Sequence, residues 1–163
     1  MNIRRAENKD TGRLIELLRD VLEVHAAIRP DIFVTGTTKY SVPELEEIIS
    51  DDSKPIYVAT DENDIVIGYC FCQIINQPSS ACLVPFKTLY IDDLCVDPGV
   101  RGGGVSTALF EYAKSEAVRL GCYNVTLNVW TGNERAEHFY EKMGMKPMKK
   151  YMEVILQSSA DES

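Results

Sequence analysis

The sequence predicts an α/β (α+β) fold in a single domain, with a mixed central β-sheet flanked by helices on both faces. A chain of 163 residues suits one domain with one sizeable core. Three strand-like segments follow one another in the middle of the chain, which favours antiparallel pairing. A later strand–helix–strand unit requires a crossover connection and therefore favours parallel pairing. The two kinds of pairing together predict a mixed sheet.

The first 50 residues are expected to form a strand and two helices. Residues 2–6 have the pattern of a short strand. Leucine and valine then recur near the helical period, and Pro30 ends that helix. A second helix opens at Ser41, because Ser41 and Glu44 have the spacing of a capping box. Pro43 lies in its first turn, where the missing N–H costs nothing.

The rest of the chain is expected to contain strands and two further helices. Apolar runs predict the strands, the sequence DEND at 61–64 predicts a turn, and Gly144 is a natural C-cap for the last helix. In chain order, the expected elements are strands 55–60, 65–75 and 86–96, a helix over about 104–120, a strand 122–130, a helix 133–143 and a strand 145–156. We expect residues 1–156 to form one domain and residues 157–163 to form a polar tail.

The composition argues against several classes of function. The net charge is -8 and the pI about 4.8, whereas a nucleic-acid-binding protein needs a basic face. The acidic charge is compatible with a cationic substrate or partner. The N-terminus lacks the apolar core of a signal peptide, and no apolar run approaches the roughly 20 residues of a membrane span. We therefore expect a cytoplasmic protein that contacts neither nucleic acid nor membrane.

The cysteines are expected to be buried free thiols. No two of them have the CxxC spacing and the chain has only two histidines, so no metal site is expected. A disulfide framework is not expected in a chain of this size. Most of the cysteines lie in or beside apolar, strand-like runs. The five are Cys70, Cys72, Cys82, Cys95 and Cys122.

A glycine-rich stretch, VDPGVRGGGVSTALF, follows the third central strand and leads into a helix. Residues 99–106 nearly match a Walker A loop, but Val105 stands where the lysine is required. Gly102 and Gly104 supply the start of a dinucleotide-binding fingerprint, but Thr107 replaces its last glycine. Both of these phosphate-binding motifs are therefore disfavoured.

A third possibility for this stretch uses the backbone alone. Gly102, Gly103 and Gly104 allow main-chain N–H groups to turn toward one concavity. The following helix adds its unpaired N–H groups and the positive end of its dipole, and Arg101 can add a charge. Such a cradle can hold a pyrophosphate. The alternative is a tight turn that uses glycines only for their conformational freedom.

The same stretch resembles the acetyl-CoA loop of the GNAT superfamily of N-acetyltransferases. That family's pattern is R/Q-x-x-G-x-G/A after a strand that ends in V-x-P, and Arg101 and Gly104 match it. Ser106 departs from the last position but is small. A second family signature, N-x-x-A-x-x-F-Y-x-x-x-G, matches residues 133–144, and the resemblance extends over the order of elements in essentially the whole chain. It implies a GNAT fold and acetyl-CoA as cosubstrate.

The resemblance also implies which residues contact acetyl-CoA. The end of the third central strand would lie along the pantetheine arm and polarise the thioester carbonyl with backbone donors. The glycine stretch would hold the pyrophosphate, and Asn133 would contact CoA or only cap its helix. The expected contacts are Leu94, Cys95, Val96, Arg101, Gly102, Gly103, Gly104, Val105, Ser106, Thr107 and Asn133.

Tyr140 and Asp92 are the catalytic candidates. By resemblance, Tyr140 donates a proton to the departing thiolate, and its reference pKa near 10 suits that transfer. YIDDLCV resembles the YxEDxxV strand of the diamine acetyltransferases, which places Asp92 at the base position and leaves Asp93 as a substrate contact. Neighbouring strand residues point to opposite faces, so only one carboxylate is expected in a given cleft. The alternatives are a packed aromatic side chain and solvated carboxylates at a sheet edge.

The resemblance implies acetyl transfer from acetyl-CoA to an amine by direct attack in a ternary complex. His25 and Arg29 lie where the family borders its acceptor site, although both could be ordinary polar residues at a helix end. A covalent route through Cys95 would need an activating base, and the sequence identifies none. The acceptor is expected to be a small-molecule or peptide amine, and a homodimer is possible by analogy. The alternative function is a non-catalytic acyl-CoA-binding or regulatory module on the same fold.

Overall fold

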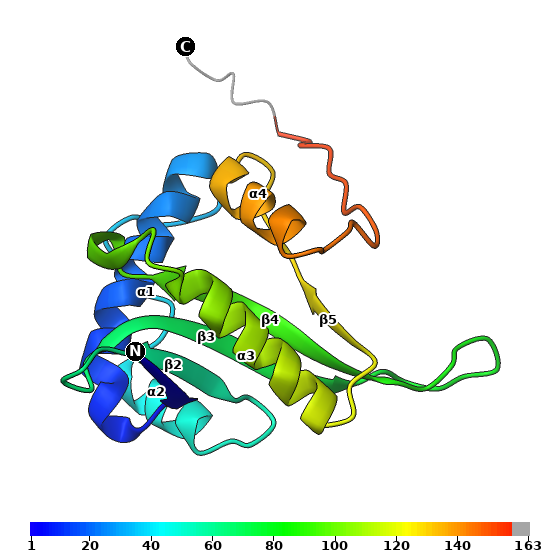
Figure 1. Ribbon diagram of the computed structural model, residues 1–163. Coiled ribbons are helices and arrows are strands. Elements are labelled where there is room, and N and C mark those ends of the chain that lie inside the picture. The colour runs from blue at the N-terminus through cyan, green and yellow to red at the C-terminus, as the bar shows by residue number, and fades with distance from the viewer. Residues whose placement is uncertain (158–163) are drawn as a thin grey trace, which may run out of the picture.

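The computed structural model describes residues 1–157 and contains a five-stranded mixed sheet with helices around it (Figure 1). The strands lie in the order β1-β2-β3-β4-β5; the first four are antiparallel to their neighbours, and β5 is parallel to β4. The elements are β1 (Asn2–Arg5), η1 (Asn8–Asp10), α1 (Thr11–Ile28), α2 (Val42–Ile49), β2 (Ile56–Thr60), β3 (Val66–Asn76), β4 (Lys87–Val96), η2 (Pro98–Val100), α3 (Val105–Arg119), β5 (Asn124–Leu127) and α4 (Glu134–Lys142). The predicted fold class is confirmed.

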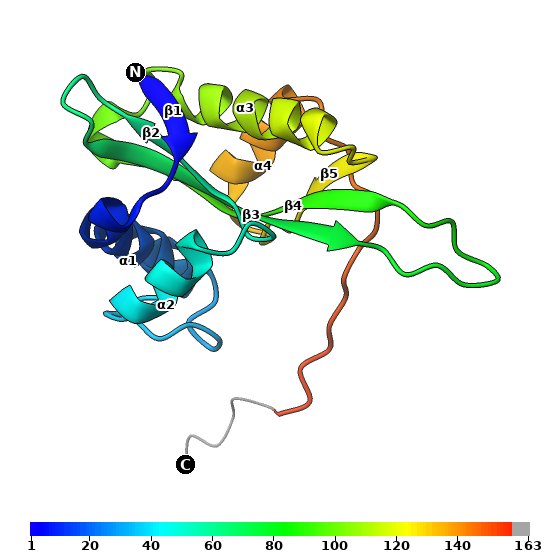
Figure 2. The same ribbon diagram turned by 90° about the horizontal axis from the view of Figure 1, so that it is seen from below.

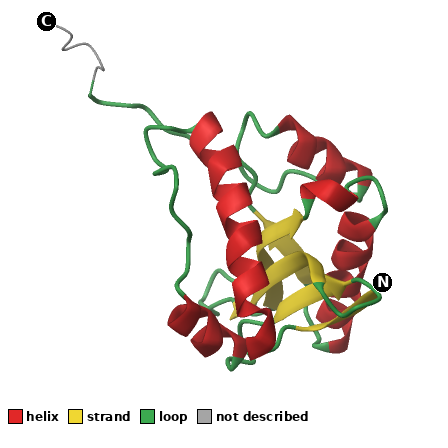
Figure 3. Cartoon of the chain, turned by 90° about the vertical axis from the view of Figure 1, so that its left-hand side faces the viewer, coloured by secondary structure: helices red, strands yellow, loops and turns green. Residues whose placement is uncertain are grey.

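Helices cover both faces of the sheet. In Figure 2, α1 and α2 lie below the strands while α3 and α4 lie above them, and Figure 3 shows the strands enclosed between helices. Each face has its own apolar core, because side chains on a strand point alternately to opposite faces. Leu14, Leu17 and Leu18 of α1 are buried on one face, and Leu109 and Phe110 of α3 are buried on the other.

An irregularity in the pairing of β3 with β4 determines how the two adjacent aspartates are placed. Phe71 lies opposite Asp93, but the next residue, Cys72, lies opposite Ile91. Asp92 is therefore the extra residue of a β-bulge. A bulge interrupts the strict alternation of side chains, so Asp92 and Asp93 need not point to opposite faces as the sequence predicts.

The parallel strands β4 and β5 separate before β4 ends. Their register runs from Thr88 opposite Asn124 to Ile91 opposite Leu127, where β5 stops. Residues 92–96 of β4 therefore extend beyond β5, and their backbone groups on that side have no strand partner in the described part of the chain. The strand predicted at 122–130 is therefore shorter than expected. Because it stops at Leu127, the edge of β4 over residues 92–96 has no strand beside it in the described part of the chain.

The predicted last strand at 145–156 is wrong as a description of this structure. These residues contain no helix or strand, and residues 146–157 are exposed. The pattern favours an extended segment, but a strand also needs a neighbour to satisfy its backbone groups, and the segment has none among the described residues. Of the polar tail expected at 157–163, all but Gln157 lies outside the described residues.

Candidate active site

The glycine stretch forms a tight left-handed turn before α3. Gly102 has a φ of +90° and Gly104 a φ of +79°, a conformation that side chains with a Cβ rarely adopt. A Cβ at Gly103 would approach the carbonyl oxygen of Val100 to 3.3 Å. Two of the three consecutive glycines thus have backbone angles that favour glycine, and the third lies close to another part of the backbone.

The helix that follows supplies unpaired backbone donors. Gly104 is the N-cap of α3, and its carbonyl accepts from Ala108 N at 3.0 Å. The N–H groups of Val105, Ser106 and Thr107 lie in the first turn and have no acceptor within the helix. Val105 is buried and anchors the turn, while residues 101–104 are exposed. This geometry fits a pyrophosphate, because the unpaired N–H groups and the positive end of the helix dipole lie at the start of α3, and the exposed Arg101 comes just before the turn.

The loop before the glycines is tied to α1. Asp97 accepts from the backbone N–H of Gly99 at 2.8 Å, and Arg13 pairs with the same carboxylate. Arg13 also donates through Nε to the carbonyl of Val66 at 3.0 Å. These contacts fix the end of β4, the start of β3 and the first helix relative to one another.

Tyr140 lies on α4, on the face of the sheet that α3 covers. Its ring packs against Phe139, with ring centroids 5.2 Å apart, and against Phe110 at 6.2 Å. Burial raises the pKa of Tyr140, and the nearby Cys70 thiol and Asp93 carboxylate raise that pKa further. The phenol therefore keeps its proton at physiological pH. A phenol that keeps its proton can act as a donor.

Asp92 is paired with a residue that the sequence did not single out. Lys39, in the connection between α1 and α2, donates from Nζ to Asp92 Oδ2 at 2.6 Å. The same ammonium lies 5.4 Å from the ring centroid of Tyr40. A hollow of about 80 Å³ adjoins the pair. It is lined by Tyr40, Ile48, Lys54, Phe71, Cys72, Gln73 and Asp92.

Asp93 lies beside the same lysine but in a more enclosed setting. Tyr69 Oη donates to Asp93 Oδ2 at 2.6 Å. Burial raises the pKa of Asp93 to about 6, although the Tyr69 hydrogen bond and the Lys39 charge lower it and only the charge of Asp92 adds to the increase. Both carboxylates thus interact with Lys39, but only Asp92 lines the hollow beside the pair. The bulge places Asp92 outside the regular pairing of β3 with β4.

At the end of β4, the backbone is open to a ligand, whereas the thiol of Cys95 is packed against α1. Cys95 is buried, its Sγ lies 4.0 Å from the carbonyl oxygen of Leu17 in α1, and burial raises the pKa of this thiol to about 12. Val96 is buried and Leu94 is partly buried on the α3 face. The side chains of residues 94–96 therefore serve packing, while their backbone lies along the open edge beyond β5.

His25 and Arg29 lie at the end of α1 in an aromatic and ionic cluster. The His25 ring lies 5.3 Å from Phe33, and Phe33 packs edge-on against Trp130 at 5.5 Å. Arg29 lies 5.8 Å from the Trp130 ring centroid and donates to both oxygens of Asp31. Burial lowers the pKa of His25. These contacts engage Arg29 and leave His25 a neutral ring at physiological pH.

Asn133 caps α4, as expected, and its side chain accepts from Ala136 N at 3.4 Å. No pattern in the sequence marks Lys39 or Tyr69 as a site residue. Lys39 lies in an irregular connection, and Tyr69 reads as an ordinary strand aromatic. Folding of the chain brings Lys39 to Asp92 and Tyr69 to Asp93.

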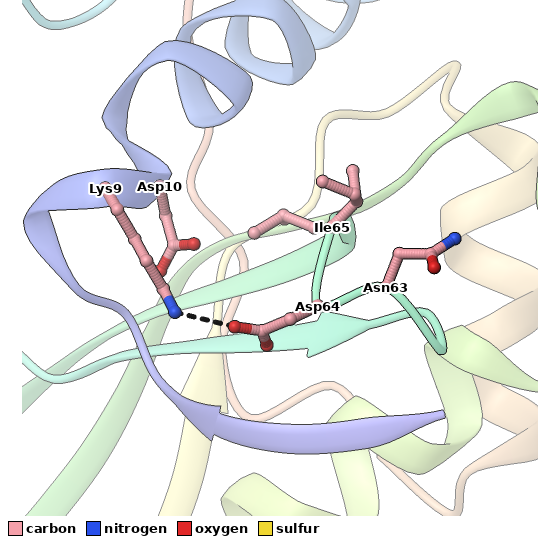
Figure 4. A pocket seen from close by; sticks show the side chains of 6 residues that line it. Lys9, Asp10, Asn63, Asp64 and Ile65 are labelled. Carbon is pink, nitrogen blue, oxygen red and sulfur yellow. Dashed lines mark hydrogen bonds and ion pairs between the residues drawn. The ribbon is translucent and has the colours of Figure 1, made fainter.

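A separate hollow of about 250 Å³ lies at the turn between β2 and β3 (Figure 4). Lys9 Nζ and Asp64 Oδ2 form an ion pair of 2.6 Å there, and Arg4 contacts the other oxygen of Asp64 at 3.0 Å. Both partners of the Lys9 pair are exposed, so the pair contributes little to stability. This hollow contains none of the predicted site residues.

No group of three or more histidine, cysteine or acidic side chains within residues 1–157 converges as metal ligands would. None of the helices in that part of the chain combines the length and apolar character needed to cross a membrane.

Comparisons with known proteins identify the family of this chain. A model of the acetyltransferase (GNAT) family matches residues 19–145. The peptidyl-lysine N-acetyltransferase YjaB of Salmonella typhimurium is 30% identical over 148 residues, which cover 90% of this chain and 83% of that protein. The thialysine N-epsilon-acetyltransferase of Bos taurus is 25% identical over 156 residues, which cover 90% of this chain and 84% of that protein.

Solved structures of other proteins have the same fold as this chain. A crystallised mutant of the BH1408 protein from Bacillus halodurans superposes with a TM-score of 0.92 and 30% identity, covering 96% of this chain and all of that one. The glucosamine-6-phosphate N-acetyltransferase of Arabidopsis thaliana superposes with a TM-score of 0.67 and 26% identity, covering 96% of this chain and 98% of that one. The chain therefore belongs to the acetyltransferase (GNAT) family and is an N-acetyltransferase of that family.

Proposed function

We propose that the protein transfers the acetyl group of acetyl-CoA to a primary alkyl amine by direct attack, with both substrates bound at once. The observation that carries this proposal is the nearness of Tyr140 to the Asp93 carboxylate, whose charge acts on the phenol, on the part of β4 that extends beyond β5. A proton donor and two carboxylates beside unpaired backbone groups meet the needs of acetyl transfer. The relatives' names add peptidyl lysine and thialysine as acceptors, and both carry a primary amine on a flexible chain.

The Lys39 contact supports an alkylammonium acceptor. Its ammonium is bound by Asp92 and lies over the face of Tyr40, which is how a lysine-like acceptor would be recognised. The acidic net charge of -8 favours the approach of a cation. We therefore propose that the acceptor amine takes the place of Lys39 on Asp92.

The local environments favour Asp93 over Asp92 as the base. An incoming ammonium must lose a proton before it attacks, and burial raises the pKa of Asp93 to about 6, which suits its carboxylate to accept that proton. Asp92 is held by its ion pair and suits binding of the ammonium. We thus propose that the roles expected from the sequence are exchanged, with proton transfer to Asp93 direct or through water.

The remaining steps use the end of β4 and α4. Backbone N–H groups of residues 94–96 would bind the thioester carbonyl oxygen, where negative charge develops during attack. Tyr140 would donate its proton to the departing thiolate. Cys95 is unsuited to a covalent route, because its buried thiol has a pKa of about 12 and faces α1. Acetyl-CoA supplies the activated acetyl group, with its pyrophosphate on the turn at residues 101–107.

A turnover screen tests the proposal. Release of CoA thiol is measured with acetyl-CoA and a panel of lysine peptides, thialysine, polyamines and amino sugars. We expect turnover with at least one primary alkyl amine and initial-rate kinetics of a ternary complex. Ping-pong kinetics, or an acetylated cysteine trapped in the absence of acceptor, would contradict direct attack. Binding of acetyl-CoA without turnover on any amine would favour the non-catalytic alternative.

A further inference from the structure

Lys39 supplies an alkyl amine at the position proposed for the acceptor. Its Nζ lies 2.6 Å from Asp92 Oδ2 and 5.4 Å from the ring centroid of Tyr40. Its charge also acts on the carboxylate of Asp93, the proposed base. The ion pair borders the hollow of about 80 Å³ that Asp92 and Tyr40 help to line. The protein itself therefore holds an ammonium, on a flexible four-carbon chain, where a lysine-like substrate would bind.

The contacts of Lys39 favour the protonated amine. Burial lowers the pKa of Lys39, but the hydrogen bond and the charge of Asp92 outweigh burial, and the pKa is raised above its usual value. The ammonium is therefore the resting form, and Nζ must lose a proton before it can attack an acyl group. An external alkylammonium bound to Asp92 must lose a proton in the same way. A base that deprotonates such an acceptor is equally well placed to deprotonate Lys39.

We propose that the protein acetylates its own Lys39 with acetyl-CoA, and that this modification frees Asp92 for an external acceptor. The inference rests on the proposed function, because it uses the same site and the same acetyl donor. Acetylation converts the ammonium into a neutral amide, which has no charge to pair with a carboxylate. The first acetyl group transferred thus removes the ammonium that competes with later acceptors.

The reaction consumes one acetyl-CoA per chain. The Lys39 ammonium passes a proton to the Asp93 carboxylate, and the neutral Nζ attacks the carbonyl carbon of the thioester. The C–N bond forms, the C–S bond breaks, and Tyr140 protonates the departing thiolate. The attacking nitrogen loses its second proton, which restores the phenol, and the proton on Asp93 passes to water. The products are Nε-acetyl-Lys39, CoA with a free thiol and one released proton.

Lys114 on α3 is a closely matched lysine outside the site. The side chain of Lys39 is 46% exposed and that of Lys114 is 45% exposed. Each ammonium pairs with a carboxylate, Asp92 for Lys39 and Glu111 for Lys114. Each also lies near an aromatic ring, with the ring centroid 5.4 Å from Lys39 Nζ and 5.8 Å from Lys114 Nζ. Uncatalysed acetylation should therefore be similar at the two lysines, and an excess at Lys39 would come from its place in the site.

Mass spectrometry of the full-length protein tests the proposal. The purified chain is treated with a lysine deacetylase and then incubated without acceptor, using acetyl-CoA with an isotope-labelled acetyl group. We expect peptide mapping to find the label on Lys39 of nearly every chain and little on Lys114. The rate should not depend on protein concentration, because each chain modifies itself. Tyr140→Phe should lower the rate at Lys39 by about 10²–10⁴-fold and leave the rate at Lys114 unchanged.

Acceptor kinetics test the consequence of the modification. Initial rates of the deacetylated protein are compared with those after preincubation with acetyl-CoA. Preincubation should lower the KM for a cationic acceptor by roughly twofold to fivefold, as for loss of a partly exposed ion pair. Lys39→Arg keeps the positive charge but has no amine to acetylate, so its KM should not respond. Lys114→Arg is the matched control and should respond as the unaltered protein does; a KM that falls equally in Lys39→Arg would contradict the release of Asp92.

Several labelling results would overturn self-acetylation. They are the absence of label on Lys39, equal labelling of Lys39 and Lys114, and label on Lys54, which lines the same hollow, in place of Lys39. A labelling rate that rises with protein concentration would also do so, because one copy would then modify another. A parallel assay with the amine panel identifies which proposal has failed. Turnover of an amine without label on Lys39 overturns self-acetylation alone, whereas the absence of both turnover and label overturns the proposed function as well.

Discussion

Lys39 holds its ammonium 2.6 Å from Asp92, in the position that we propose for the acceptor amine. The two residues come from the α1–α2 connection and from a bulge in β4. The charge of Lys39 also lowers the pKa of Asp93. One side chain therefore competes with the proposed acceptor and, at the same time, keeps the proposed base closer to ionisation.

Replacing Lys39 should separate these two effects. Lys39→Met removes the competing ammonium, so the KM for a cationic acceptor should fall by roughly twofold to fivefold, as for loss of a partly exposed ion pair. The same change removes a positive charge from Asp93 and should move the acidic limb of the pH–rate profile to higher pH. Steady-state kinetics over a pH series measures both. Lys114→Met, in an exposed pair on α3, is the control; an unchanged or raised KM in Lys39→Met would contradict the competition.

The pH dependence of kcat/KM should report Asp93. The base acts only when deprotonated, so activity should fall as pH drops through about 6, the pKa to which burial raises this carboxyl. Tyr69→Phe deletes a hydrogen bond that lowers the pKa, so the acidic limb should move to higher pH. Tyr57→Phe, a buried tyrosine packed against α3, should leave the limb in place. A limb that Tyr69→Phe does not move would exclude Asp93 as its source.

Asp93→Asn and Asp92→Asn should change different kinetic constants. Loss of the base should lower kcat by about 10²–10⁴-fold, whereas loss of the ammonium-binding carboxylate should mainly raise KM for the acceptor. The opposite result would restore the roles that the sequence suggested.

Tyr140→Phe tests the proton donor with little change in packing. The ring contacts with Phe110 and Phe139 remain, but the hydroxyl is lost. We expect kcat to fall by about 10²–10⁴-fold while the Kd for acetyl-CoA, measured by calorimetry, stays the same. Tyr112→Phe on α3 is the matched control. If Tyr140→Phe loses only acetyl-CoA affinity, the phenol is a binding group and not the acid.

The sequence predicts most elements because their patterns are local. The expected helix 104–120 is observed as Val105–Arg119, and the expected strand 86–96 as Lys87–Val96. The helical period, the capping residues and the glycines within each element indicate where that element begins and ends. The glycine turn could also be predicted, since its backbone geometry depends on residue types at neighbouring positions.

The rest of the site depends on contacts between distant residues. The bulge at Asp92 arises from the register of β3 against β4, which no local pattern encodes. Lys39 reaches Asp92 across 53 positions of sequence. The segment 145–156 shows the same limit, because its pattern indicates a strand but does not say whether a neighbouring strand is there to pair with it.

The glycine turn gives a test in which strain and ligand binding can be separated. Gly104→Ala places a Cβ in a left-handed conformation, which costs roughly 1–2 kcal/mol of stability. No atom lies within 4 Å of that Cβ, so the cost is backbone strain alone. Relief of the strain would turn the first N–H groups of α3, and the KM for acetyl-CoA should rise. Gly121→Ala is closely matched, with a φ of +75° and no neighbour within 4 Å, but it lies at the far end of α3.

We therefore expect the two glycine variants to lose similar stability in urea unfolding, while only Gly104→Ala weakens acetyl-CoA binding. Arg101→Gln should weaken the same binding and reduce its dependence on salt, because it removes an exposed charge near the turn. If Gly104→Ala and Gly121→Ala change acetyl-CoA affinity equally, the effect comes from loss of stability. The pyrophosphate would then be held somewhere other than residues 101–107.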